Sequence, residues 1–283
     1  MPFSYNKWLL VALLLAGNIG VWNAVAAEAA HPLRIYVLDV GQGDAIYVEA
    51  PNGNSLLLDG GPDRSVLRRL GEIMPWYRRS IDLIALSHPH KDHFEGLIDV
   101  VSRYKVGGLV GSGTQTDDPY YRSWREALIQ EKVSEVILGK GAVIDLGGGV
   151  LLTTLLPRED ATHSTPHDGM LVMRLDYGES SILFTGDMEE NLESGLAIFE
   201  REEIRSDVLK VGHHGSRTSS SEQFLDAVGP AIAVISLGKG NSYGHPHSEV
   251  VERLLSRKIE IFRTDSEGTV LLESEGERFV IQK

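Results

Sequence analysis

Four potential metal ligands follow directly after an apolar run that predicts a buried strand. The run is "IDLIALS" at 81–87, and His88, His90, Asp92 and His93 follow it in "HPHKDH". A short continuous apolar run is typical of a strand that is buried on both faces of a sheet. A fold built around this strand must therefore display the cluster where the strand ends. A histidine-rich surface loop is the alternative, and the gathering of four ligands after a buried strand disfavours it.

The spacing within the cluster suits two cations. His88 and His90 are two residues apart, so in an extended segment their side chains project the same way. Asp92 and His93 then face a neighbouring position, so one loop could serve two cations about 3.5–4 Å apart. Neutral imidazole and carboxylate suit Zn²⁺, Fe²⁺ or Mn²⁺. The chain has no cysteine, which excludes thiolate ligands and disulfides.

The remaining sequence alternates between strand and helix patterns, which predicts an α/β fold. Two strand-rich halves with interspersed helices predict two sheets packed face to face with helices outside. An Asn-Gly turn in "PNGN" joins two strands of an early meander. We expect strands at 33–40, 44–51, 55–61, 81–87, 142–157 (a hairpin), 169–187 (two strands), 206–215 (a strand and then a loop), 231–238, 259–265 and 269–275, and helices at 64–73, 95–104, 189–201, 221–228 and 248–257.

Further ligand candidates stand at other predicted strand ends. Asp187 ends the apolar "ILFTGD", although it could instead cap the helix predicted near residue 189. The pair His213 and His214 follows a strand in "LKVGHHGS". Six or seven ligands would hold two cations and leave positions for water, and a water held by two cations loses a proton near neutral pH. The pattern therefore predicts metal-assisted hydrolysis. Three further candidates are Asp59 in "LLLDGG" and His163 and His167 in "THSTPHDGM".

These segments resemble the metallo-β-lactamase superfamily. The similarity extends from about residue 33 to 274 and is carried by "LDVGQGDAIYVEAPNGNSLLLDGG", "SHPHKDH", "ILFTGD", "LKVGHHGS" and "GHPH". Within the superfamily, the sequence is similar to the extracytoplasmic metallo-hydrolase domain of ComEC-type competence (DNA-uptake) proteins and to its stand-alone relatives. The resemblance implies a four-layer αβ/βα sandwich of two mixed sheets, with the site at the edge between them.

The resemblance also implies a role for each ligand. His88, His90 and His167 would bind one divalent cation, Asp92, His93 and His214 a second, and Asp187 would bridge them. Zn²⁺ and Mn²⁺ are the expected cations. Asp92 would also orient the nucleophilic water, and Asp59 would support the site without binding metal.

The sequence departs from the ComEC pattern in three places. ComEC-type domains often carry Asp at the position of His90 and Asn at that of His167, so this chain has a more complete ligand set. Glu95 stands where the pattern usually has Gly. The multi-helix channel of that family has no counterpart here, so we do not expect this chain to conduct DNA.

Residues near the second histidine pair are candidates for substrate contact. Adjacent residues point to different sides, so one of the pair His213 and His214 binds metal and the other faces substrate; the analogy favours His214 as the ligand. His213 would then donate a proton to the leaving group, and His245 is a second catalytic candidate. The candidates for phosphate contact are Ser216, Lys239, Asn241 and His247. For His247 the alternative is a lead-in to a helix capped by Ser248.

The N-terminal residues 1–30 predict a secretory signal peptide or a membrane anchor. Lys7 precedes an apolar run from Trp8 to about Trp22, and "AVA" at 24–26 is a small-x-small cleavage pattern. The alternative is a retained anchor, because the apolar stretch reaches about 20 residues. Either would place a hydrolase domain at residues 31–283 outside the cytoplasm, secreted, periplasmic or membrane-anchored.

Three functions remain open at this point. The first is an exported phosphodiesterase or nuclease that uses a metal-bound hydroxide, with a phosphodiester such as single-stranded DNA as substrate. The second is a hydrolase of a β-lactam, a thioester or cell-wall phosphocholine. The third is a non-catalytic adaptor that handles DNA, which the formal net charge of −13 disfavours. No protein partner is identifiable from the sequence.

Overall fold

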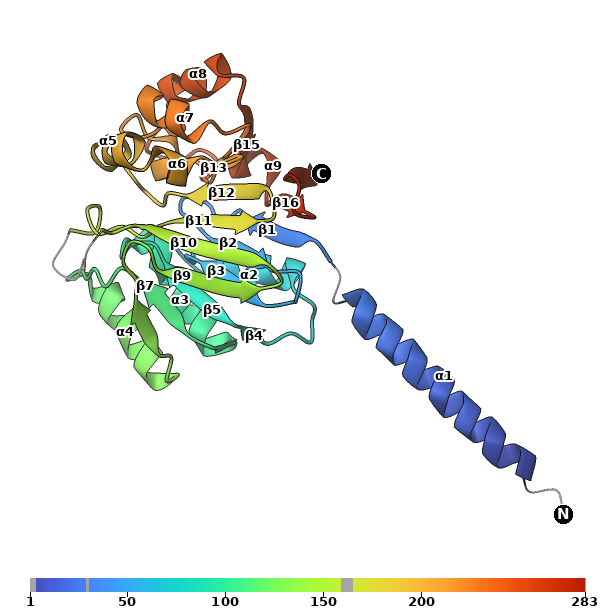
Figure 1. The fold of residues 1–283 in the computed structure, drawn as a ribbon. Helices are drawn as coiled ribbons and strands as arrows, with labels where there is room; N and C mark the ends of the chain where they lie inside the picture. The colour runs from blue at the N-terminus through green and yellow to red at the C-terminus, as the bar shows by residue number, and fades with distance from the viewer. Residues whose placement is uncertain (1–3, 29–30, 159–164, 283) are drawn as a thin grey trace.

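The computed structural model describes residues 4–28, 31–158 and 165–282. His163, one of the histidines considered above, lies outside the described residues. Two mixed sheets dominate the structure, and each combines an antiparallel part with a parallel part (Figure 1).

The first sheet begins as the predicted meander and continues as parallel strands. The turn at 51–54 joins two antiparallel strands, with Val48 opposite Leu56. The third strand then runs parallel to the strand before the histidine cluster, with Leu57 opposite Ile84. In sheet order the strands are β17 (Val280–Gln282), β16 (Val270–Ser274), β1 (Leu33–Val37), β2 (Ile46–Glu49), β3 (Ser55–Leu58), β5 (Leu83–Leu86), β7 (Leu109–Gly111) and β8 (Glu135–Ile137).

The second sheet repeats this design. Its first four strands are antiparallel, and the next three join in parallel, with Phe184 opposite Lys210 and Lys210 opposite Val234. In sheet order the strands are β15 (Glu260–Arg263), β14 (Ile232–Ile235), β13 (Val208–Lys210), β12 (Ser180–Phe184), β11 (Val172–Tyr177), β10 (Val150–Leu156) and β9 (Val143–Gly147).

Helices cover the outer face of each sheet. Three helices pack on the first sheet: α2 (Ser65–Ile73), α3 (Lys91–Arg103) and α4 (Pro119–Gln130). Three others pack on the second sheet: α5 (Glu190–Phe199), α7 (Glu222–Val228) and α8 (Ser248–Ser256). The shorter elements are α6 (Arg201–Ile204), the 3₁₀ turn η1 (Gly212–Gly215), α9 (Thr264–Glu267) and the paired strands β4 (Ser80–Ile81) and β6 (Lys105–Val106).

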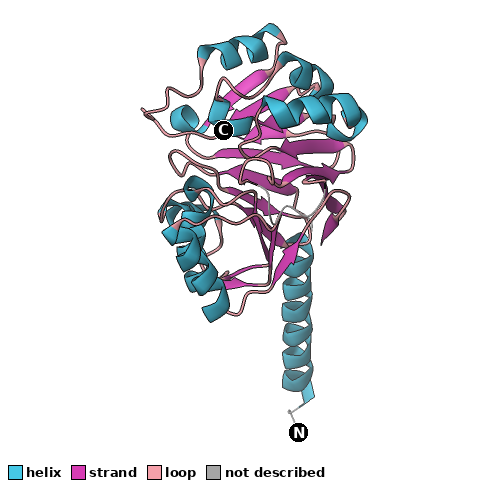
Figure 2. Ribbon diagram, turned by 90° about the vertical axis from the view of Figure 1, so that its left-hand side faces the viewer, coloured by secondary structure: helices cyan, strands magenta, loops and turns pink. Residues whose placement is uncertain are grey.

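Three apolar layers hold these elements together. The central layer lies between the sheets and includes Val48 from one sheet and Phe184 from the other. The outer layers join each sheet to its helices, through residues such as Trp124 on one side and Phe224 on the other. Helix, sheet, sheet and helix therefore follow one another, with helices above and below the strands in Figure 2. The expected four-layer αβ/βα sandwich is confirmed.

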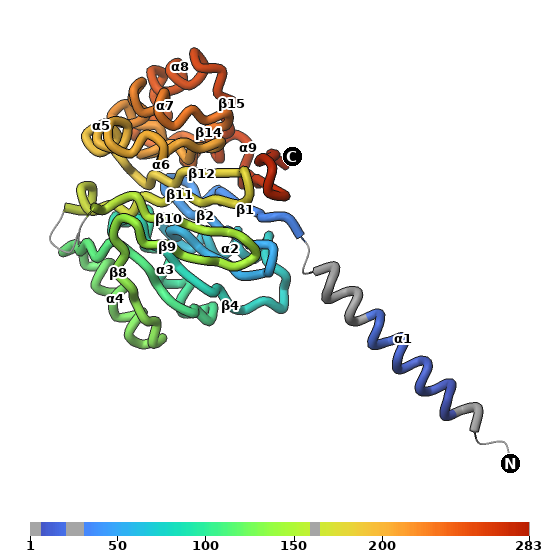
Figure 3. The backbone as a smooth tube through the Cα atoms, viewed as in Figure 1, coloured from blue at the N-terminus to red at the C-terminus, as the bar shows by residue number. Residues whose placement is uncertain are grey.

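Helix α1 (Ser4–Glu28) lies apart from these layers (Figure 3). Its apolar side chains are exposed where the structure describes them, for example Trp8 at 73% and Leu13 at 63%. Among the described residues, no helix has both the length and the apolarity required to cross a membrane.

Candidate metal centre

Four of the predicted site residues lie at the carboxyl ends of parallel strands in the two sheets. Asp59 follows β3, His88 follows β5, Asp187 follows β12, and His214 follows β13. Parallel strands present their carboxyl ends at one edge, and ligands bind in the crevice there. The packing of two such sheets brings the two edges together at one place.

The histidine cluster is split between a loop and a helix. His88 and His90 lie in the loop before α3, whereas Asp92 and His93 lie in the first turn of this helix, which begins at Lys91. We expected this helix to begin near residue 95, so it starts four residues earlier. His90 is its N-cap residue with extended φ and ψ of −91° and 146°. The change from extended to helical backbone turns the two pairs of ligands toward different positions.

One group of donor atoms comes from Asp92, His93, Asp187 and His214, whose ligand atoms lie within 4.8 Å of one another. Nε2 of His93 lies 3.3 Å from Oδ1 of Asp187. Nε2 of His214 lies 3.4 Å from the same oxygen and 3.4 Å from Oδ2 of Asp92. We call these four residues the second cluster.

In the second cluster, Nδ1 of each histidine faces away from Asp187 and lies against a hydrogen-bond acceptor. Nδ1 of His93 lies 2.8 Å from Oδ2 of Asp59. Nδ1 of His214 lies 2.8 Å from the carbonyl oxygen of Ser236. An acceptor at Nδ1 places the hydrogen there, so Nε2 is available to a cation. Asp59 also accepts two hydrogen bonds from Ser87, from its backbone N–H and its hydroxyl, each at 2.7 Å.

Another group of donor atoms comes from His88, His90 and Asp187. We call it the first cluster, because it contains the first two histidines of "HPHKDH". Nε2 of His88 lies 2.9 Å from Nδ1 of His90 and 3.8 Å from Oδ2 of Asp187. The ring of His167 lies beside His90, with ring centroids 4.6 Å apart. Asp187 thus offers Oδ2 to the first cluster and Oδ1 to the second. Helix α5 has Glu189 as its N-cap residue, so Asp187 does not have the alternative capping role.

The donor atoms at the centre fit a divalent cation. Nε2 of His93, Nε2 of His214 and Oδ1 of Asp187 are buried without a hydrogen-bond partner among the described residues. Leaving a buried polar atom unpaired costs about 1–3 kcal/mol. A cation between these atoms would satisfy all three of them, and imidazole with carboxylate is a suitable ligand set.

Burial and neighbouring charges shift the pKa values of the buried histidines in different directions. Burial lowers the pKa of His214, but Asp187 and Asp44 outweigh it and raise that pKa to about 10. Burial acts in the same direction on His93, and Asp187 and Asp59 nevertheless raise its pKa well above the usual value. Burial and the neighbouring His93 keep the pKa of His88 well below that of a free histidine. A cation in the second cluster must therefore displace protons, whereas His88 is already neutral.

The backbone conformation of η1 directs the side chains of its two adjacent histidines to different places. Both residues have left-handed φ, 47° for His213 and 54° for His214, which is unusual for residues other than glycine. The His214 side chain is 2% exposed and lies in the second cluster. His213 is 26% exposed; its Nε2 lies 3.9 Å from Asp187 and its Nδ1 lies 3.2 Å from Glu189. The geometry favours His214 as the ligand and leaves His213 at the mouth of the centre.

A hollow of about 170 Å³ opens above the centre. It contains His213 and His245 among the predicted catalytic residues. Burial, followed by the nearby His214, lowers the pKa of His245 to about 4, so this ring is neutral at neutral pH. The lining residues are Gln42, His90, Asp92, His167, Asp187, His213, His214, Tyr243 and His245.

The four predicted phosphate contacts do not line this hollow. The Asn241 side-chain amide donates to the carbonyls of Gly238 and His245, and its oxygen accepts from Tyr243 and His245, so it organises its own loop. Nδ1 of His247 lies 3.2 Å from the Arg217 backbone N–H. His247, not Ser248, is the N-cap residue of α8, and its side chain makes no capping hydrogen bond. The remaining two are Ser216, which bonds to Thr218, and the exposed Lys239.

Several residues around the centre were not singled out from the sequence. Gln42 and Tyr243 line the hollow, and Ser236 holds His214. Lys210 and Asp44 form a buried ion pair behind the second cluster. Lys210 lies within "LKVGHHGS" and Asp44 within "DVGQGD", two segments quoted above. Their pairing across 166 positions could not be predicted from the sequence.

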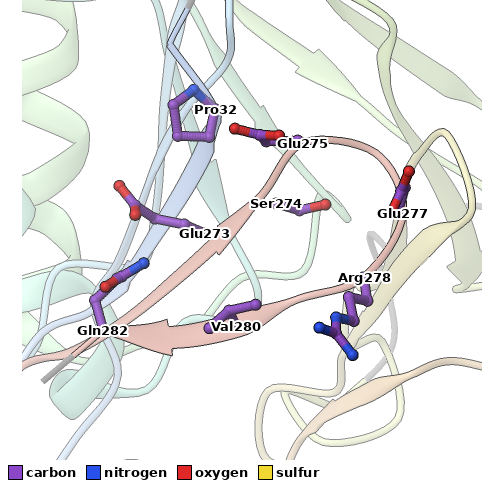
Figure 4. A pocket seen from close by; sticks show the side chains of 8 residues that line it. All are labelled: Pro32, Glu273, Ser274, Glu275, Glu277, Arg278, Val280 and Gln282. Carbon is purple, nitrogen blue, oxygen red and sulfur yellow. The ribbon is translucent and has the colours of Figure 1, made fainter.

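A separate hollow of about 240 Å³ lies beside the β16–β17 hairpin (Figure 4). Carboxylates and Arg278 line it, together with Pro32, and none of the predicted site residues does. It is therefore unrelated to the histidine centre.

The fold and the donor set define a class of protein: an αβ/βα sandwich with clustered histidines and carboxylates for divalent cations at the edge of its sheets. The chain belongs to the metallo-β-lactamase superfamily, whose family description, "Metallo-beta-lactamase superfamily", matches residues 38–239. The superfamily predicted from the sequence is thereby confirmed.

The curated relatives of this chain include competence proteins of the ComEC type. ComE operon protein 3 of Bacillus subtilis (strain 168) is 31% identical over 255 residues, which cover 84% of this chain and 32% of that protein. Competence protein ComA of Neisseria gonorrhoeae is 30% identical over 262 residues, 91% of this chain and 34% of that protein. This chain thus spans about a third of the length of these relatives.

A solved structure supports the fold. The metallo-beta-lactamase fold protein YhfI from Bacillus subtilis superposes with a TM-score of 0.59 at 13% identity. The superposition covers 86% of this chain and 100% of that one.

Proposed function

We propose that the chain is an exported two-metal phosphodiesterase or nuclease of the ComEC-like branch. The supporting observation is the convergence of three buried atoms that have no hydrogen-bond partner in the described part of the chain. They are Nε2 of His93, Nε2 of His214 and Oδ1 of Asp187, and they lie below an open hollow. Similarity to competence proteins favours a phosphodiester such as single-stranded DNA as substrate.

The cation ligands follow the two clusters. Two divalent cations, Zn²⁺ or Mn²⁺, would polarise the phosphodiester and activate water. His88, His90 and His167 would hold the first, and Asp92, His93 and His214 the second. Asp187 would hold both, because its two oxygens face different clusters.

The chain's own residues would orient substrate and move protons. Asp92 is one-third exposed at the mouth of the second cluster, so its free oxygen would orient the attacking water. His213 would protonate the leaving oxygen, because it lines the hollow and the Glu189 carboxylate lies 3.2 Å from its Nδ1. His245, being neutral, would bind substrate by a hydrogen bond and would not supply a proton. Asp59 would fix the ring of His93.

The location outside the cytoplasm is part of the proposal. Residues 1–30 would act as signal peptide or anchor, and residues 31–283 would form the hydrolase domain. The apolar side chains that α1 exposes support a membrane-directed segment.

Turnover of a defined substrate panel tests the proposal. The full chain is stripped with a chelator, reloaded with Mn²⁺ or Zn²⁺, and offered a nitrophenyl phosphodiester, single-stranded DNA and nitrocefin. We expect phosphodiester hydrolysis that is lost in His88→Ala, Asp187→Asn and His214→Ala. Faster nitrocefin hydrolysis would indicate a lactamase instead. Bound metal with DNA binding and no turnover would indicate an adaptor.

A further inference from the structure

A fully buried ion pair lies behind the second cluster. Nζ of Lys210 is 2.6 Å from Oδ2 of Asp44, and the side chains are 0% and 2% exposed. The ammonium also donates to the carbonyl oxygen of Val211 at 3.1 Å. Removing two charges from water costs several kcal/mol per ion, and an apolar pair of similar volume is often at least as stable. Stability alone therefore does not account for a charged pair at this place.

The carboxylate of this pair faces His214. Oδ1 of Asp44 lies 3.5 Å from Nδ1 of His214, the nitrogen that also faces Ser236. This oxygen has no hydrogen-bond partner of its own among the described residues. A negative charge behind the ring favours the hydrogen on Nδ1 and leaves Nε2 to a cation.

The backbone at Gly43 and Asp44 contacts a second residue of the same cluster. The Asp44 N–H donates to the carbonyl oxygen of Asp92 at 3.2 Å. A Cβ atom on Gly43 would stand 2.2 Å from that carbonyl oxygen. The carbonyl of Gly43 accepts from the Ser236 hydroxyl at 2.7 Å. Two residues of one segment thus brace both Asp92 and His214.

The ammonium of Lys210 supplies the positive charge that balances the buried carboxylate of Asp44. Asp44, Asp59 and His93 are close enough to hold a metal ion. The ammonium of Lys210 already lies against Asp44, however, and His93 is bonded to Asp59. The ammonium therefore occupies the place that a metal ion would otherwise take beside Asp44. It holds the Asp44 carboxylate in position and neutralises its charge.

We propose that the Asp44–Lys210 pair positions His214 and thereby sets the affinity of the second of the two cation positions. Asp44 and Lys210 are positioning residues here, since their contacts reach the cation only through His214 and Asp92. The inference rests on the proposed two-cation function. Removal of an outer partner of a metal ligand typically lowers metal affinity about 10–100-fold, and we expect this loss at the second position alone.

Metal titration of four variants tests this without any substrate. Asp44→Asn removes the charge with little change of shape, and Lys210→Met removes the counter-charge. The double variant removes both charges, so it leaves no unpaired buried charge. It therefore replaces Lys210→Met if that variant fails to fold. Asp207→Asn is the matched control: Asp207 accepts two hydrogen bonds from Ser181 at the opposite end of the second sheet's parallel strands. The metal-stripped full chain is titrated with Zn²⁺ against a chromophoric chelator, and with Co²⁺ while its visible spectrum is recorded.

We expect two tight equivalents of Zn²⁺ in the wild type and in Asp207→Asn. Asp44→Asn and the double variant should retain one tight equivalent, bind the second about 10–100-fold more weakly, and lose one component of the Co²⁺ spectrum. Two unchanged affinities in Asp44→Asn, or equal weakening of both, would overturn the inference, even if the melting temperature falls. A wild type that binds no cation would overturn the proposed function itself, which is a distinct result.

Discussion

Oδ2 of Asp59 lies 2.8 Å from Nδ1 of His93, and both side chains are fully buried. The carboxylate fixes the ring so that Nε2 faces Asp187. Asp59 would thus act on the centre from behind the proposed ligand His93, which is the supporting role that the family resemblance predicts.

Asp59→Asn should therefore weaken cation binding at the second cluster by about 10–100-fold. Isothermal titration of the metal-stripped protein measures the affinity. Asp82→Asn is the control, because Asp82 accepts the same two bonds from Ser55, at the other end of the parallel strands. Equal affinities in the two variants would show that Asp59 has only a structural role.

Asp187→Asn should weaken binding at both clusters, because each oxygen of this carboxylate faces a different one. A direct ligand contributes more than an outer partner, so the affinity should fall by more than about 100-fold, and turnover with it. Elemental analysis after gel filtration gives the metal content. Asp145→Asn, at an exposed position of β9, should retain both cations. Retention of one tight cation in Asp187→Asn would argue against a shared ligand.

Much of the fold was predictable because its patterns are local. The apolar run at 81–87 and the Asn-Gly turn at 52–53 each specify a strand or hairpin through adjacent residues. The start of α3 was not predictable, because "HPHKDH" lacks the apolar spacing of a helix although Asp92 and His93 are helical. Asp92 and His93 belong to the candidate metal centre, and no amphipathic pattern marks their turn of the helix.

The centre was predictable in its ligand types and much less so in its surroundings. Histidines and aspartates at strand ends can be recognised from the sequence because their side chains are typical metal ligands. The groups that hold the other ring nitrogen of each histidine cannot be recognised in this way. Nδ1 of His214, for example, is held by the carbonyl oxygen of Ser236, and every residue type has a carbonyl oxygen. Lys210 and Asp44 meet only because the two sheets pack together, 166 positions apart.

The metal-free protein should become less stable as the pH rises. Burial lowers the pKa of His214, and Asp187 and Asp44 more than reverse this and raise it from 6.5 to about 10. A pKa that is raised on folding adds stability that is complete below the unfolded pKa and is lost as the pH rises through the folded pKa. The free energy of unfolding should therefore fall between pH 6.5 and about 10.

Urea unfolding in the presence of a chelator measures this trend. With Zn²⁺ present the trend should reverse over the same range, because a cation requires neutral imidazoles and competes with their protons. A metal-free protein whose stability is flat across this interval would show that His214 is not held protonated.

His213→Gln should discriminate between substrates by leaving group. His213 lies at the mouth of the centre with Glu189 at its far nitrogen. A general acid contributes on the order of 10²–10⁴-fold, and only a basic leaving oxygen requires it. Cleavage of DNA should therefore slow by this factor, while a nitrophenyl phosphodiester should lose less than about tenfold. His247→Gln, outside the hollow, is the control, and equal losses on the two substrates would exclude proton donation by His213.

Gly43→Ala should disturb the second cluster more than the equivalent change two residues earlier. Gly43 has φ of 141°, and a Cβ atom there would stand 2.2 Å from the carbonyl oxygen of Asp92, so the first turn of α3 must move at Asp92. Gly41 has φ of 81° and open space around its Cβ position. Both changes carry backbone strain of about 1–3 kcal/mol, and urea unfolding should show it in each variant. Only Gly43→Ala should also weaken the second Zn²⁺ equivalent in a chelator competition, and an equal effect of both on Zn²⁺ affinity would remove the close approach at Asp92 as the cause.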